Sequence, residues 1–123
     1  MNINVEGVIF ELQPVGGISR IYQEVLPRIC SQNEGVSINI VTVEKILQQL
    51  PSHQRIKHIQ SPSWPYRYIR PAQLFSGLRD FVRIETEAIK LSSRQRSIWH
   101  ATYFKIPKKW NGPRTVSVYD LTY

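Results

Sequence analysis

The spacing of the apolar residues predicts strands that alternate with helices. β-Branched and aromatic residues cluster over residues 3–10, which predicts a mostly buried strand, and Gly16 and Gly17 follow in a turn. The next apolar positions step mainly by three and four, as on one face of a helix: Ile18, Tyr22, Val25, Leu26 and Ile29. Pro27 lies within that segment and is expected to kink or shorten the helix.

The middle of the chain predicts shorter elements. Residues 36–41 alternate as a second strand, and residues 56–59 have the composition of a brief third one. Residues 46–50 favour a short helix that Pro51 would end, and a proline-rich passage covers residues 62–71.

The last third of the chain continues the alternation. Apolar side chains recur at helical spacing over residues 74–89 and predict a surface helix. Residues 98–104 predict a strand, residues 107–113 a turn-rich loop, and residues 116–118 a last strand that ends near Asp120.

This order of elements predicts the fold class. Strands that alternate with helices pair in parallel through right-handed crossovers, so we expect a single α/β domain over residues 1–123, with helices on both faces of a Rossmann-like sheet. Ligands of such sheets bind beyond the carboxyl ends of the strands. We therefore expect a site in the loops after Phe10, Ala101 and Val118.

Composition narrows the function classes. The chain has 16 Lys and Arg against 9 Asp and Glu, a net charge of +7, which favours an anionic partner such as phosphate, nucleic acid or an acidic lipid surface. Cys30 is the only cysteine, so an internal disulfide is excluded and a reducing cytoplasm is expected. Signal-peptide and membrane-spanning patterns are absent, as are serine-nucleophile, phosphate-loop and paired-cysteine motifs.

A few polar residues in the predicted loops could carry chemistry. The helix start after Gly16 and Gly17 offers unpaired N–H groups to an anion, and Arg20 adds a positive charge; a plain tight turn is the alternative. His100 is either a site residue or a buried histidine with satisfied hydrogen bonds. His53 and His58 have no cysteines or paired acids near them, so no metal site is expected.

Two groups of aromatic and basic residues could bind an anionic surface or polymer, although a loop packed on the core is the favoured explanation of the first and a solvated loop that of the second. The first group comprises Trp64, Tyr66, Arg67, Tyr68 and Arg70. The second comprises Lys105, Lys108, Lys109, Trp110 and Arg114.

Two segments resemble the family 4 retaining glycosyltransferases that build bacterial surface polysaccharides. The first is Gly7-Val8-Ile9-Phe10, Leu12-Gln13 and Gly16-Gly17-Ile18-Ser19-Arg20, which is similar to the N-terminal signature of that family. The second is Trp99-His100-Ala101-Thr102-Tyr103-Phe104 with Pro107, followed by Val116-Ser117-Val118-Tyr119-Asp120-Leu121-Thr122-Tyr123. Together they cover about half of the chain in the family's order.

The resemblance implies the N-terminal, acceptor-side domain of a GT-B fold, in which two Rossmann-like halves face each other across a cleft. It implies that Gly16, Gly17 and Arg20 lie near the donor diphosphate and that His100 and Tyr103 contact the acceptor. Enzymes of this family transfer sugar with retention of configuration and generally need no metal, so no cofactor is expected.

The sequence departs from the family in two places. Asp120 matches the acid of the family's His-Asp pair, but Tyr119 stands in place of the histidine, which leaves Tyr119 and Asp120 as the catalytic candidates. The donor-binding half has no counterpart, so we expect an incomplete domain that transfers no sugar alone and meets a nucleotide sugar only together with such a half. The competing hypotheses are a basic module that binds an anionic polymer or the inner membrane face, with nucleic acid least favoured, and a self-associating remnant that forms a homodimer.

Overall fold

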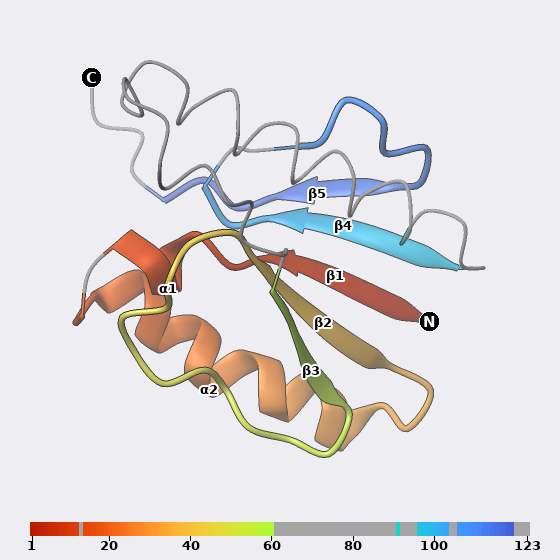
Figure 1. Ribbon diagram of the computed structural model, residues 1–123. Coiled ribbons are helices and arrows are strands. Elements are labelled where there is room, and N and C mark those ends of the chain that lie inside the picture. Colours follow the sequence, from red (N-terminus) through yellow and green to blue (C-terminus); the bar gives the residue numbers. More distant parts are fainter. Residues whose placement is uncertain (13, 61–90, 92–95, 104–105, 120–123) are drawn as a thin grey trace.

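A five-stranded parallel sheet forms the centre of the protein (Figure 1). The computed structural model describes residues 1–12, 14–60, 91, 96–103 and 106–119. The strands lie in the order β3-β2-β1-β4-β5 and every neighbouring pair is parallel. Their bounds are β1 Asn2–Glu6, β2 Ser37–Thr42, β3 Ile56–Gln60, β4 Ser97–Ala101 and β5 Arg114–Val116. The predicted α/β Rossmann-like fold class is confirmed.

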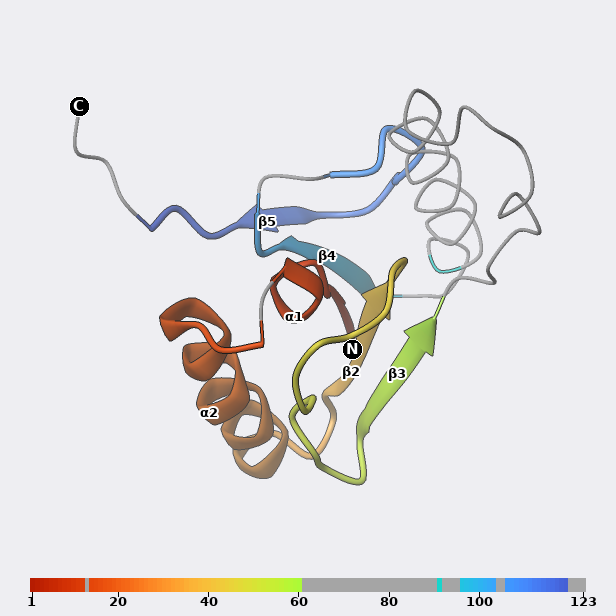
Figure 2. The same ribbon diagram turned by 60° about the vertical axis from the view of Figure 1, so that its left-hand side comes forward.

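Two helices follow β1 along the chain. A single turn, α1 (Ile9–Leu12), leads to the long helix α2 (Gly17–Gln32), which lies along one face of the sheet (Figure 2). α2 buries Tyr22, Leu26 and Cys30, which are four residues apart and therefore share one face of the helix. Pro27 lies inside α2 and does not shorten it, because packing of this face against the sheet outweighs the hydrogen bond that proline removes.

The first predicted strand is wrong beyond Glu6. β1 ends there, Gly7 makes the turn, and the apolar residues that follow form α1. The turn is held by the Phe10 N–H, which donates to the Gly7 carbonyl at 3.0 Å, and by the Glu11 N–H, which donates to Val8 at 3.0 Å. The apolar pattern of these residues fits a buried strand and a buried helical turn alike, and Phe10 is fully buried in the helical turn.

The prediction of a short helix over residues 46–50 is also wrong, because these residues form no helix. The backbone there pairs with other elements: the Leu47 N–H donates to the Phe10 carbonyl at 2.8 Å, and the Gln23 side chain donates to the Gln49 carbonyl at 2.7 Å. β5 ends at Val116, before the predicted end near Asp120. The predicted helix over residues 74–89 and the aromatic group Trp64–Arg70 lie outside the described residues.

Apolar side chains pack on both faces of the sheet. One core lies between α2 and the sheet around Val5, Phe10, Ile38 and Ile40, with Cys30 fully buried as a small apolar residue. The second core lies on the opposite face: Val41, Leu91, Trp99, Ala101 and Trp110.

Trp110 belongs to that second core and not to a membrane-facing surface. Its ring lies 5.7 Å from that of Trp99 between centroids, and none of its surface is exposed. The indole N–H donates to the Pro113 carbonyl at 3.0 Å. The second basic and aromatic group is therefore divided, because its tryptophan is buried while Lys108 and Lys109 are exposed.

Gly7 and Gly17 provide a matched test of which glycine the fold requires. A Cβ on Gly7 would lie 2.5 Å from Thr42 Cγ2 and 2.8 Å from the Val41 carbonyl oxygen, whereas a Cβ on Gly17 would meet nothing within 4 Å. We expect Gly7→Ala to lower the free energy of unfolding by about 1–3 kcal/mol through overpacking. Gly17→Ala should leave it unchanged or raise it by up to about 1 kcal/mol. Equal urea midpoints for the two variants would contradict this assignment.

Candidate functional site

The strand order changes direction beside β1. The chain leaves β1 through α2 to β2 on one side, while β4 pairs with β1 on the other side and continues outward to β5. In open parallel sheets such a switch point leaves a crevice at the carboxyl ends of the strands, where ligands bind. The switch point between β1 and β4 is therefore the expected position of a ligand-binding site.

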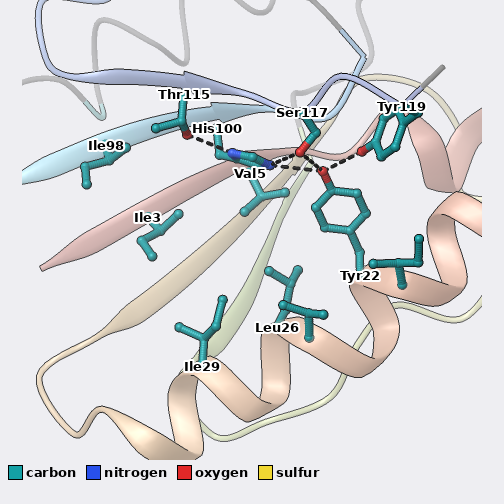
Figure 3. A pocket seen from close by; sticks show the side chains of 12 residues that line it. Ile3, Val5, Tyr22, Leu26, Ile29, Ile98, His100, Thr115, Ser117 and Tyr119 are labelled. Atoms are coloured by element: carbon teal, nitrogen blue, oxygen red, sulfur yellow. Dashed lines mark hydrogen bonds between the residues drawn. The ribbon is translucent and has the colours of Figure 1, made fainter. Parts of the chain in front are cut away.

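Five polar side chains meet at this point and form the polar cluster: Tyr22, His100, Thr115, Ser117 and Tyr119 (Figure 3). Tyr22 is its hub. The Tyr22 hydroxyl accepts a hydrogen bond from the Tyr119 hydroxyl at 2.5 Å and donates one to Ser117 Oγ at 2.7 Å. It also lies 3.0 Å from His100 Nε2. On the outer side His100 Nδ1 lies 2.7 Å from Thr115 Oγ1.

Strand register and helix position bring these residues together. Val5, His100 and Thr115 are paired across β1, β4 and β5, so their side chains leave the same face of the sheet. α2 lies on that face and presents Tyr22, 6% exposed, from its second turn. Residues 78 positions apart in the sequence, Tyr22 and His100, thereby come into contact.

An apolar groove of about 390 Å³ extends from the polar cluster along α2. Figure 3 shows its lining from β1, α2, β4 and the β5 segment. Beside the cluster residues the lining is aliphatic: Ile3, Val5, Ile21, Val25, Leu26, Ile29 and Ile98. Ile21 and Val25 are 53% and 42% exposed, so the α2 wall of the groove is open to solvent.

The polar cluster is uncharged at neutral pH. Burial lowers the pKa of His100, which keeps its imidazole neutral. Burial, reinforced by the hydrogen bond to Tyr22, raises the pKa of Tyr119 above its usual range, so its phenol keeps its proton. The cluster thus offers hydroxyl and imidazole groups that suit neutral, hydroxylated ligands.

The structure brings two of the predicted site residues together. His100 and Tyr119 both contact the Tyr22 hydroxyl. His100 is half-buried and bonded at both ring nitrogens, so its hydrogen bonds are satisfied, while its role in a site stays a prediction. Tyr103 lies apart from the groove lining, 47% exposed, with its N–H donating to Glu6 Oε2 at 3.0 Å. Asp120 lies outside the described residues.

Gly16, Gly17 and Arg20 lie together at the start of α2, apart from the groove lining. Gly16 is the N-cap, with φ −162° and ψ 145°, an extended conformation that any residue adopts. No glycine among the described residues has a positive φ, and a Cβ on Gly17 would meet no atom within 4 Å, so neither backbone strain nor packing within the described chain explains the glycine at this position. Arg20 is exposed in the first turn.

Sequence reasoning missed Tyr22, Thr115 and Ser117. Tyr22 was assigned to the apolar face of the helix, where its ring lies, but its hydroxyl reaches the cluster. Thr115 and Ser117 alternate with Val116 and Val118, which are exposed. A polar residue at every second position of that segment was the available signal.

Two further properties of the described residues bear on function. No helix among them is long and apolar enough to cross a membrane. Within the same residues, no three His, Cys, Asp or Glu side chains gather where they could hold a metal ion.

Comparison with known proteins adds no relative. The chain matches no protein-family model, and no curated protein or solved structure is significantly similar to it. The resemblance to glycosyltransferases therefore rests on the residues quoted above, and function has to be argued from the site.

The buried imidazole makes the stability of the protein depend on pH. Because the pKa of His100 is lowered in the folded state, its stability contribution is complete above the unfolded pKa of 6.5 and is lost as the pH falls toward the folded pKa. We expect the free energy of unfolding to fall from pH 7 to pH 5, measured by urea denaturation.

Two variants isolate the share that His100 contributes. His100→Gln should flatten this pH dependence. His58→Gln removes the other histidine whose pKa burial lowers. It should leave unchanged the part of the pH dependence of the free energy of unfolding that His100 contributes. An unchanged pH dependence in His100→Gln would contradict the assignment.

Proposed function

We propose that this chain is the acceptor-side domain of a retaining glycosyltransferase that uses a nucleotide sugar in polysaccharide or glycolipid synthesis. The observation that carries the proposal is the polar cluster at the switch point between β1 and β4. Sugars are neutral and carry several hydroxyl groups, each of which both donates and accepts. Three hydroxyls and a neutral imidazole, linked by successive contacts of 2.5 to 3.1 Å, match that chemistry.

The groove beside the cluster supports the glycolipid form of the acceptor. A ligand that places its sugar on Tyr119 and Ser117 would extend its other end over aliphatic side chains of α2 and β4. Ile21 and Val25 leave apolar surface exposed there. Burying hydrocarbon against such surface contributes about 25 cal/mol per Å².

The start of α2 is consistent with binding of the donor diphosphate nearby. Its first N–H groups have no partners within the helix, and the open space at Gly17 lets a ligand approach the backbone. Arg20 adds a positive charge in the same turn. A glycine that packing does not require is consistent with a role in contact with a ligand.

Tyr119 separates this chain from an ordinary member of the resembled family. A phenol with a raised pKa stays neutral where the family's histidine would face the transferred sugar. Under the proposal the chain supplies acceptor contacts and transfers no sugar when purified alone. Sustained release of nucleoside diphosphate from a nucleotide sugar by the 123-residue protein would contradict this part.

Alkyl glycosides test the acceptor site directly. We expect a hexyl glycoside to bind more tightly than the methyl glycoside of the same sugar, by up to about fourfold for each methylene buried in the groove. Isothermal titration calorimetry measures both constants. Val25→Ser should reduce the preference for the longer chain, whereas Leu47→Ser, which alters an equally exposed leucine away from the groove, should preserve it.

Two results would contradict the proposed function. The first is an affinity that does not depend on alkyl length. The second is the absence of glycoside binding together with attachment to anionic vesicles that disappears between low and moderate salt, which would favour the basic binding module instead.

A further inference from the structure

The hydrogens of the polar cluster can be placed by counting donors. Each hydroxyl and the neutral imidazole have one hydrogen to donate. Tyr119 gives its hydrogen to Tyr22, and Tyr22 gives its own to Ser117 Oγ at 2.7 Å. The hydrogen of Ser117 is then free for His100 Nε2 at 3.1 Å. Since Nε2 accepts, the ring hydrogen is on Nδ1 and is donated to Thr115 Oγ1 at 2.7 Å.

The opposite tautomer would close the Tyr119 end of the cluster to a ligand. With its hydrogen on Nε2, His100 would donate toward Ser117 or Tyr22, and Ser117 would already receive the hydrogen of Tyr22. The hydrogen of half-buried Ser117 would then turn to the Tyr119 oxygen, with which Ser117 also interacts through a side-chain hydrogen bond, and it would occupy the atom that a ligand hydroxyl has to reach. In the first arrangement the spare hydrogen belongs to exposed Thr115, where water or a ligand can accept it.

We propose that Tyr119, Tyr22, Ser117, His100 and Thr115 form a directional hydrogen-bond chain that receives the proton of a ligand hydroxyl at Tyr119 and ends on His100 as the base. The ligand follows from the proposed function: it is the acceptor hydroxyl of a saccharide. Tyr119 is the contact residue at the entry of the chain. Tyr22 and Ser117 are positioning residues that connect Tyr119 to the imidazole of His100, which lies on their opposite side (Figure 3).

The proton transfer balances along this chain. As the acceptor oxygen loses its proton to Tyr119 Oη, the hydrogen of Tyr119 moves to Tyr22, that of Tyr22 to Ser117 and that of Ser117 to His100 Nε2, giving an imidazolium. The oxygen keeps the electron pair of its O–H bond and forms the bond to the anomeric carbon of the nucleotide sugar, on the face from which the diphosphate leaves, as retention of configuration requires. The bond from that carbon to the diphosphate breaks, and the diphosphate leaves with its electron pair.

The residues around the hydrogen-bond chain are consistent with proton movement from Tyr119 toward His100. His100 faces Tyr22 from α2, Val5 from β1, and Thr115, Ser117 and Tyr119 from the β5 segment. None of these carries a charge at neutral pH, and the carboxylate that acts on the cluster is Glu6, which raises the pKa of Tyr119 further. Tyr119 therefore passes a hydrogen on without ionising. His100 is the residue of the cluster that takes up the proton, against the burial that lowers its pKa.

The tautomer of His100 tests the direction of the chain without any ligand. Long-range ¹H–¹⁵N NMR of the labelled protein at pH 8 separates a protonated ring nitrogen from an unprotonated one. We expect hydrogen on Nδ1 in the wild type. Thr115→Val removes the acceptor of that hydrogen and should shift the population toward Nε2, while Thr115→Ser should restore the wild-type tautomer. Hydrogen on Nε2 in the wild type, or no response to Thr115→Val, would overturn the proposal.

A second measurement tests the connection through Tyr22. Saturating hexyl glycoside should shift the Nε2 resonance of His100 in the wild type and leave it in place in Tyr22→Phe, which keeps the aromatic ring but lacks the linking hydroxyl. Equal shifts in both proteins would overturn the chain and leave the proposed function intact. If no glycoside binds at all, the proposed function fails instead, and the ligand-free tautomer still decides the direction of the chain.

Discussion

The pairing of β1 with both β2 and β4 is the constraint on which the rest of the structure depends. It holds residues 2–6 in register with residues 37–41 on one side, and residues 2–5 in register with residues 97–100 on the other. A parallel neighbour requires the chain to return along the sheet, and α2 is that return between β1 and β2. The same pairing makes β1 and β4 the edges of a switch point, and it places the second turn of α2 opposite the end of β4.

The candidate site depends on a balance between burial and hydrogen bonding. A half-buried imidazole and a nearly buried phenol are costly unless their polar atoms are bonded, and here each ring nitrogen of His100 and the hydroxyl of Tyr22 have partners within 3.1 Å. Burial also keeps these groups neutral. The result is a compact group of hydroxyls beside an aliphatic groove, which fits a ligand with a hydroxylated head and an apolar extension.

Local patterns in the sequence were sufficient for the fold class but not for the site. Long periodic segments such as α2, and β-branched runs such as β2, were predicted correctly because many residues carry the same signal. The strand predicted through Phe10 failed because the close approach of Gly7 to Val41 is a tertiary contact. Tyr22 was missed because its spacing indicates only the apolar face of its ring, and its hydrogen-bond partners come from segments 78 to 97 residues away.

Under the proposed function, a saccharide head lies on the polar cluster while its apolar part lies in the groove. Intermolecular nuclear Overhauser effects between the protein and a bound hexyl glycoside measure this placement directly. We expect contacts from the sugar protons to the rings of Tyr22 and Tyr119, and from the alkyl protons to the methyl groups of Ile21 and Val25. Contacts confined to other surfaces, or alkyl contacts at the cluster with the sugar elsewhere, would contradict it.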